Sequence, residues 1–597
     1  MSRPAYTAFP PIKLSRSGSG SSGNGRPHNA PLTSGKIVLK RKPSPDKLPR
    51  LSKSAKITRR PQQSSYKYMI RPGNNVRLVM QALRKRPWWH PVTSSELEGV
   101  KKLSNDSGNI SLLWEMYRNP KRFKTPKYKN TLYNHLEFNS ALVTKKGLYE
   151  CLKTYCSGPS NTLNIEMSTV VPRTFYLCPS GMAKGKGAEL AQDDMKEWLE
   201  YNRTFSRNCS VPVPADLNSS SVSMVTEAEV EAETEAGAEG METELSPAKG
   251  SSSAMDISVS GNNAAENALS NINTNSDGSE DAVWILKPAS LTNRGFGIQV
   301  VRGVNAVLKV VDSAGYDDSE EPEPPDSADS PVRKANRPPP TENGLEKAAN
   351  TRGARTGWIV QEYMERPLLI SGRKFDIRCY VVLTLSSKLG LKAFFYNEAY
   401  IRTSCKKYNL SRLEDRETHL TNDAVQKNSK NYGKFEQGNK LSLAEWQSSI
   451  SVDYPGTSPT IVADQIFPRI KELSQFSIMA AKETLCKSTF SKTFELLGYD
   501  YMVDDQFQPT LIEINSNPSL EMGGSALLTG LIPQLVNSTI TKAVDPLYKP
   551  AMLPPSARTS VEGGSGIAGK YTSGTEEALR LIEAENETCK FEELSLL

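Results

Sequence analysis

The sequence contains few of the residues that metal sites and nucleophilic catalysis use most often. Only four of its 597 residues are histidines (His28, His90, His135 and His419), so we do not expect a metal site built from imidazoles. The eight cysteines are scattered and none lies in a C-x-x-C pair. This pattern argues against structural zinc and favours a reduced intracellular protein.

Long apolar runs are also missing. No run approaches the roughly 18 residues of a membrane-spanning helix, and the N-terminus has no apolar core of a signal peptide. We therefore expect a cytoplasmic protein without a membrane segment.

Several long stretches lack the large apolar residues from which a core is built. They are rich in Ser, Gly and Pro, or in Ala, Asp and Glu, a composition that predicts disorder. The basic run between Lys36 and Arg60 either contacts an acidic partner, nucleic acid or an import receptor, or only keeps the chain soluble. We expect a disordered basic arm at 1–64, an α/β module at 65–205, a disordered acidic insert at 206–281, a main domain at 282–547 with a disordered insert at about 313–354, and a mostly disordered tail at 548–597 with a short helix at 574–587.

The stretch from Leu497 to Pro518 carries the clearest site pattern. Leu497–Asp504 and Thr510–Pro518 each alternate apolar and polar residues around a short polar turn, which predicts a β-hairpin. Asp500 then lies on one strand, with Glu513 and Asn515 on the same face of the other. Such oxygen ligands suit Mg²⁺. The alternative is an edge hairpin whose polar residues face solvent.

Upstream strands carry cations that suit phosphates. Lys287 ends the strand pattern Val283–Pro288 and is followed by a turn with Gly295 and Gly297. A lysine beside such a turn can contact a phosphate as a point charge, although the glycines can equally shape a simple hairpin.

The segment Gly372–Leu383 predicts a strand with Lys374, Asp376 and Arg378 on one face. Charges on a buried strand are costly unless they are paired or used. They therefore indicate either a functional site or a structural ion-pair ladder. A neighbouring strand brings Arg402 to the same region, and we expect His419 to have a structural role.

These motifs occur together in a recognisable order: Lys287-Pro288, Gly295-x-Gly-Ile298, Gln361-x-Tyr363, Arg373–Arg378, Tyr400–Ser404, His419–Asn422, Gln426-Lys427, Tyr499–Asp504 and Glu513-Ile-Asn515. Taken together, 282–545 resembles the tubulin–tyrosine ligase family, and 66–178 resembles its N-terminal module more faintly. The resemblance implies an α+β ATP-grasp fold, with antiparallel sheets and flanking helices, preceded by a small α/β module. It also implies a ligase that uses ATP and Mg²⁺ to join an amino acid to a protein through an acyl-phosphate.

The resemblance also implies roles for individual residues. Asp500, Glu513 and Asn515 would hold Mg²⁺. Arg378, Arg402 and Glu513 would be catalytic, the arginines holding the acceptor carboxylate or the acyl-phosphate. The implied ATP-binding residues are Lys146, Lys287, Gln361, Tyr363, Met364, Lys374, Asp376 and Asn422.

We expect the substrates to be a free amino acid and the acidic C-terminal tail of tubulin. Ser429–Asn439 looks most like tyrosine-adding members, whereas Tyr363–Ile370 looks as much like glycine-adding ones. Tyrosine is the favoured interpretation, with glycine or glutamate as alternatives. Two hypotheses of other classes are a catalytically idle tubulin-binding scaffold and an ATP-grasp ligase that acts on another substrate. We further expect a monomer at the microtubule cytoskeleton, including cilia or flagella, and no nucleic-acid partner.

Overall fold

The computed structural model describes residues 66–93, 110–162, 164–179, 186–209, 281–289, 295–312, 357–550 and 569–596. The predicted basic arm at 1–64, the insert at 313–354 and nearly all of the acidic insert at 206–281 lie outside these ranges. Residues 206–209 complete a helix and residue 281 precedes a strand. The described residues belong to one unit that spans 62–597, and its mixed helix and sheet content agrees with the α+β prediction.

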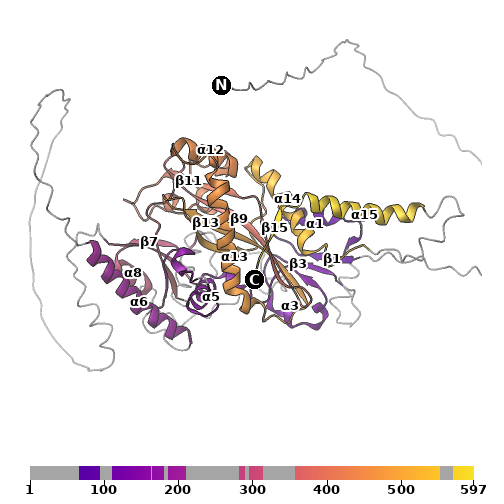
Figure 1. The fold of residues 1–597 in the computed structure, drawn as a ribbon, viewed down its shortest axis with the longest axis horizontal. Helices are drawn as coiled ribbons and strands as arrows, with labels where there is room; N and C mark the ends of the chain where they lie inside the picture. The colour runs from indigo at the N-terminus through magenta and orange to yellow at the C-terminus, as the bar shows by residue number, and fades with distance from the viewer. Residues whose placement is uncertain are drawn as a thin grey trace, which may run out of the picture. The chain divides into compact units, whose positions relative to one another are not determined.

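A long strand, β9 (Arg373–Ser386), lies at the centre of the larger sheet. Its alternation sends Phe375, Ile377 and Cys379 into a core shared with helices α5 and α13, while Tyr380 and Val382 face helices α1 and α14. Figure 1 shows α13 beside β9 and β13. The helices are α1 (Val76–Arg84), α4 (Ser140–Val143), α5 (Lys145–Ser157), α12 (Leu443–Asp453), α13 (Phe467–Leu485) and α14 (Ala526–Ala543).

The strands next to β9 run antiparallel to it, and the predicted hairpin is confirmed. β13 pairs with β14 so that Asp500 stands opposite Glu513, and a register shift follows between Asp500 and Tyr501. β9 also pairs with β10 and β11, and β11 pairs with β12. Their bounds are β10 (Gly390–Tyr396), β11 (Tyr400–Lys407), β12 (Lys440–Ser442), β13 (Lys492–Val503) and β14 (Pro509–Ser516).

The first strands of the chain extend the same sheet. They pair in parallel in the order β2-β1-β3-β4, and β4 pairs with β13. Residues predicted to form an N-terminal α/β module therefore share a sheet with the main domain. These strands are β1 (Tyr66–Ile70), β2 (Trp89–Pro91), β3 (Leu112–Trp114) and β4 (Leu132–Tyr133), with the short helix α3 (Pro120–Lys124) between β3 and β4.

A second, four-stranded sheet has the order β5-β8-β6-β7 and is antiparallel throughout. Trp198, Trp284 and Trp358 fill its core, which helices α6 and α8 cover (Figure 1). The elements are β5 (Thr174–Leu177), α6 (Lys186–Cys209), β6 (Val283–Pro288), β7 (Gln299–Arg302), α8 (Val304–Asp312) and β8 (Trp358–Glu362).

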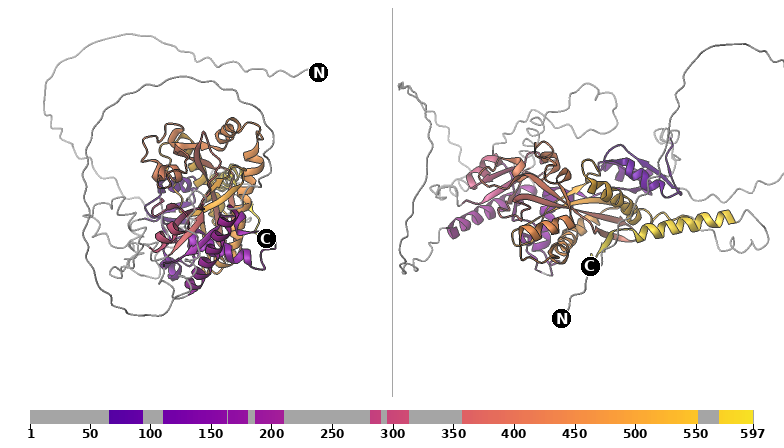
Figure 2. Two further views of the ribbon diagram at one scale, coloured as in Figure 1. Left: turned by 90° about the vertical axis from the view of Figure 1, so that its left-hand side faces the viewer. Right: turned by 90° about the horizontal axis from the view of Figure 1, so that it is seen from above.

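The C-terminal tail is more ordered than its composition predicts. Helix α15 (Gly569–Glu587) contains the predicted helix at 574–587, and strand β15 (Phe591–Leu594) pairs antiparallel with β10 (Figure 2). Phe591 and Leu594 are buried while the two glutamates between them are exposed. The predicted helix is therefore present within 569–596, whereas the strand was not predicted; two apolar side chains and a ladder of backbone hydrogen bonds hold it.

The buried Glu495 links two segments of the chain through hydrogen bonds. Its buried carboxylate accepts hydrogen bonds from the Asn139 side chain (2.8 Å), the Leu136 backbone N–H (3.0 Å) and the Ser516 hydroxyl (2.7 Å). Burial raises the pKa of Glu495, but His135, the Leu136 N–H and the Ser516 hydroxyl outweigh it and hold the pKa below its ordinary value. The carboxylate thereby connects the start of α4 with the end of β14.

None of the described helices is long and apolar enough to cross a membrane.

Candidate active site

A row of charged side chains crosses one face of the large sheet. Arg402 on β11 pairs in register with Asp376 on β9, and Arg378 on β9 pairs with Asp500 on β13. Residues opposite each other in antiparallel strands share a face. Glu513 on β14 continues the row beyond Asp500.

Two arginines and two aspartates in this row form a buried ion-pair ladder. Arg378 donates to Asp500 from Nε at 2.5 Å and from Nη2 at 3.0 Å. Arg402 reaches both acids, with Nε 2.5 Å from Asp376 Oδ1 and Nη2 2.9 Å from Asp500 Oδ2. All four residues are buried, so the ladder given above as the structural alternative is present.

The two aspartates of the ladder differ in their pKa. Burial raises the pKa of Asp500, but Arg378 and Arg402 together outweigh burial and hold it below its ordinary value. Asp376 has one arginine and a hydrogen bond from the Thr421 hydroxyl. Its pKa stays raised, because burial and the negative charge of Asp500 exceed that stabilisation.

The predicted metal ligands meet at the end of this row. Asn515 Nδ2 lies 3.1 Å from Asp500 Oδ2 and 3.1 Å from Glu513 Oε1. The described residues contain no group of three or more His, Cys, Asp or Glu side chains that could hold a metal. Glu513 and Asn515 fit Mg²⁺ as oxygen donors if the Asn515 amide turns over. Asp500 gives its oxygens to the two arginines in this structure.

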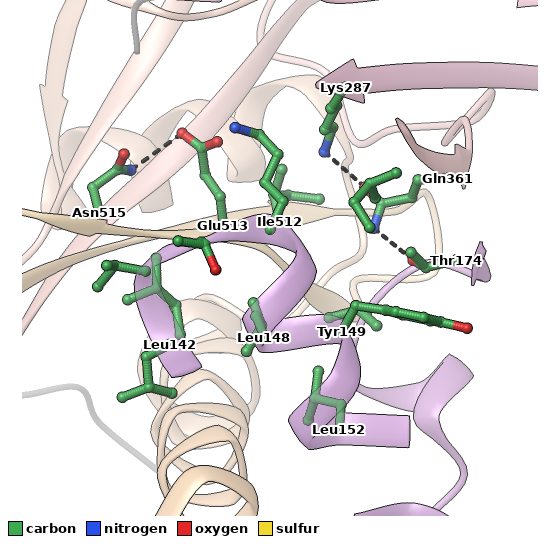
Figure 3. Close-up of a pocket in the computed structure, with 16 residues that line it drawn as sticks. Leu142, Leu148, Tyr149, Leu152, Thr174, Lys287, Gln361, Ile512, Glu513 and Asn515 are labelled. Atoms are coloured by element: carbon green, nitrogen blue, oxygen red, sulfur yellow. Dashed lines mark hydrogen bonds between the residues drawn. The ribbon is translucent and has the colours of Figure 1, made fainter. Parts of the chain in front are cut away.

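A pocket lies between the two sheets, and Glu513 and Asn515 form part of its wall (Figure 3). Lys287 enters it from β6 and donates to Gln361 Oε1 at 2.8 Å, while Gln361 donates to Thr174 Oγ1 at 2.9 Å. Burial lowers the pKa of Lys287 to about 8; Glu513 opposes this shift and Lys145 adds to it. Gln361 therefore fixes the position of an amine that is costly to keep charged.

A second buried lysine stands close to Lys287. Lys374 donates to the Tyr363 hydroxyl at 2.8 Å, and that hydroxyl lies 2.7 Å from His419 Nδ1. Burial, reinforced by the charge of Lys287, lowers the pKa of Lys374 to about 7. His419 Nε2 lies 2.9 Å from the Arg412 carbonyl oxygen, so His419 supports the tyrosine that holds Lys374.

Comparison with known proteins decides the family. A model described as the Tubulin-tyrosine ligase family matches residues 249–551, just over half of the chain. The chain belongs to the tubulin–tyrosine ligase family. The family resemblance inferred from the motifs is thereby confirmed.

Individual members of the tubulin–tyrosine ligase family match smaller parts of the chain. "Tubulin glycylase 3D" of Tetrahymena thermophila is 28% identical over 269 residues, which cover 45% of this chain and 21% of that protein. "Probable tubulin polyglutamylase TTLL9" of Mus musculus is 34% identical over 164 residues, 27% of this chain and 33% of that protein. "Protein polyglycylase TTLL10" of Macaca fascicularis is 27% identical over 274 residues, 45% and 39% respectively. The chain thus spans 21% to 39% of these relatives.

Of two neighbouring lysines at the start of helix α5, the structure places the one that was not predicted in the wall of the pocket. Lys146 does not line the pocket, whereas Lys145 does. The Lys146 amine lies 4.1 Å from the ring centre of Tyr176 and 3.7 Å from Glu150 Oε1. Thr144 caps helix α5 by accepting from the Gly147 N–H, and successive helical residues point about 100° apart. Only one of the two lysines can therefore face the pocket.

Of the other predicted ATP-binding residues, Lys287 and Gln361 line the pocket. Thr174, which sequence analysis missed, lines it as well. Asn422 caps a short helix, α11 (Asp423–Gln426), by accepting from the Ala424 N–H. The Met364 carbonyl accepts a hydrogen bond from Tyr408, and no contact of the Met364 side chain links it to the pocket among the described residues. The nucleotide roles of all the predicted residues remain predictions.

We expect substitutions of Lys145 and Lys146 to differ in their effect on nucleotide affinity. Lys145→Met should weaken the binding of a fluorescent ATP analogue about 10- to 100-fold, the effect of losing one charge-assisted contact to a phosphate. Lys146→Met is the matched control, because it removes the same charge one residue away, and should change affinity less than about threefold. Equal losses from both variants would show that the orientation of helix α5 does not decide which lysine binds.

Proposed function

We propose that the chain is an ATP-dependent ligase with an ATP-grasp fold, which joins an amino acid to the C-terminal tail of tubulin through an acyl-phosphate. Family membership and the printed names of the relatives support a tubulin-directed ligase. Those names describe glycylases and polyglutamylases, so the expected preference for tyrosine finds no support. Glycine or glutamate fits better, and we propose one of these two. The microtubule cytoskeleton is the corresponding place of action.

The observation that carries the proposal is the pocket in which two lysines, one carboxylate and one amide converge. Lys145 and Lys287 line the pocket and can bind phosphate oxygens, and Gln361 holds Lys287 in place. Glu513 and Asn515 line the same pocket and are the residues that would hold Mg²⁺, and bound Mg²⁺ would neutralise charge on the transferred phosphoryl group. Such a site works by alignment and charge stabilisation and needs no covalent nucleophile.

The arginine ladder continues from this pocket and suits the carboxylate that becomes the acyl-phosphate. The ion pairs use Nε and Nη2 of both Arg378 and Arg402, so Nη1 of each is not consumed by them. Asp376 and Asp500 hold the guanidinium groups rigid, which reduces the reorganisation needed when negative charge develops. The ladder can therefore be both structural and functional.

The proposal is tested by offering the full chain tubulin, ATP and Mg²⁺ with glycine, glutamate or tyrosine in turn. Mass spectrometry of the tubulin tails should find added glycyl or glutamyl residues. Addition of tyrosine alone would restore the first expectation. Tails that stay unmodified with all three amino acids, while ATP is not consumed, would overturn the proposed activity.

Nucleotide binding should depend on pH because of the two buried amines. The lowered pKa values of Lys374, about 7, and Lys287, about 8, mean that both are charged at lower pH and lose their protons as pH rises. Phosphate binding needs the charged form, so affinity should fall as pH rises above 7, where Lys374 loses its proton, and more steeply above 8, where Lys287 does, by up to about tenfold per pH unit for each amine. Titration with a fluorescent ATP analogue measures this, and Lys287→Met should flatten the upper part of the curve. Constant affinity across this range would contradict it.

A further inference from the structure

A second group of charged side chains adjoins the arginine ladder on the side away from the nucleotide pocket. Lys440 on β12 stands opposite Arg402 on β11, so it extends the charged row on the same face of the sheet. Its amine lies 2.6 Å from Asp423 Oδ1 and donates to the Gly438 carbonyl at 2.8 Å. Lys440 is thus a buried cation next to the predicted reaction centre.

The single negative charge of Asp423 is surrounded by more positive charge than it can neutralise. Besides Lys440, its carboxylate binds the amine of Lys427 at 2.8 Å and accepts from the Tyr432 hydroxyl at 3.0 Å. Burial raises the pKa of Asp423, but the two lysines outweigh it and lower the pKa to about 2. Two positive charges and one negative charge therefore share this place, and the positive charge of Arg402 lies next to it.

The solvent exposure of the side chains in this cluster increases with distance from the sheet. The side chains of Lys440, Asp423 and Lys427 are 5%, 29% and 47% exposed. A small solute can therefore reach the carboxylate and the outer lysine, while Lys440 supplies charge from beneath. Of the three N–H groups of the Lys440 ammonium, the contacts above use two.

We infer that Lys440, Lys427 and Asp423 form the subsite for the free amino acid, with the lysines holding its carboxylate and Asp423 its amine; this rests on the proposed ligase function. An amino acid carries both charges and so complements a cluster that contains both. An acidic tubulin tail also offers carboxylates, but Asp423 would repel it. The position beside Arg402 places the amine near the acyl-phosphate, whose carbonyl carbon the deprotonated amine attacks while phosphate leaves.

The test compares Lys440→Met with Lys471→Met in the full chain. Lys471 is also an ion-paired lysine, 2.7 Å from Glu592, but it lies outside the site. Lys440→Met should raise the KM for glycine or glutamate about 10- to 100-fold and leave the KM values for ATP and for tubulin within about threefold. Lys471→Met should leave all three unchanged, and Lys440→Arg should recover part of the loss.

Calorimetry without tubulin separates this inference from the proposed function. Glycine and glutamate are titrated into the chain loaded with a non-hydrolysable ATP analogue. Amino-acid binding that Lys440→Met abolishes supports the subsite even if tubulin is not the acceptor. Unchanged amino-acid binding, or a loss confined to an acidic tail peptide, overturns the subsite while leaving the ligase intact. If Lys440→Met does not fold, as judged by nucleotide binding, Lys427→Met gives the same comparison at a more exposed position.

Discussion

Replacing Glu513 with glutamine should lower tubulin-dependent ADP release about 100- to 1,000-fold, the effect of removing one preorganised charge from a reaction centre. Glu513 lines the pocket, and its negative charge supports the protonated form of Lys287. Glutamine keeps the size of the side chain but carries no charge. It would therefore weaken metal binding and also lower the pKa of Lys287 further, so that fewer phosphate contacts remain charged.

The control for Glu513→Gln is Glu483→Gln, which removes a 91% exposed carboxylate from the surface of helix α13. It should leave ADP release unchanged. The Glu513 variant should lose more affinity for the ATP analogue between pH 7 and pH 8 than the wild type does, because Lys287 loses its proton earlier. Full activity of Glu513→Gln would mean that the metal and the phosphates are held elsewhere.

The hairpin and the central strand could be predicted because their signals are local. Alternation over Leu497–Pro518 and Gly372–Leu383 fixes which side chains share a face, and a short turn fixes the pairing of β13 with β14. The residues of the candidate metal site and of the ladder can therefore be predicted from the sequence pattern. Their partners could not be found in this way, because Arg402 meets Asp376 and Asp500 only through the order of strands in the sheet.

What sequence analysis missed depends on distant contacts or on small changes in orientation. The choice between Lys145 and Lys146 depends on where helix α5 begins. Strand β15 has two glutamates at its centre and looks like a solvated tail. It is a strand because the edge of β10 supplies hydrogen bonds and Lys392 and Lys471 face those glutamates.

Removing Arg402 should destabilise the fold as well as the site. Arg402→Met leaves the buried Asp376 without its arginine partner and leaves Asp500 with Arg378 alone. Breaking a buried ion pair in this way typically costs about 3–5 kcal/mol of unfolding free energy. Urea unfolding at pH 7 measures the loss. Arg366, which is largely exposed and 3.6 Å from Asp505, provides a control, because Arg366→Met should change stability by less than about 0.5 kcal/mol.

The pH dependence of this loss identifies its cause. Without Arg402, the folded-state pKa of Asp376, which is already raised, should rise further above its unfolded value. A carboxyl with a raised folded-state pKa favours the folded state when protonated, and this stability is lost as pH rises through that pKa. Arg402→Met should therefore be least stable relative to wild type near pH 8 and should recover part of the difference toward pH 5. Adding Asp376→Asn should remove this dependence, because the amide cannot ionise. A loss that is equal at both pH values, and unaffected by the second substitution, would mean that Arg402 stabilises the sheet by packing and that the charges of the ladder matter only for the reaction.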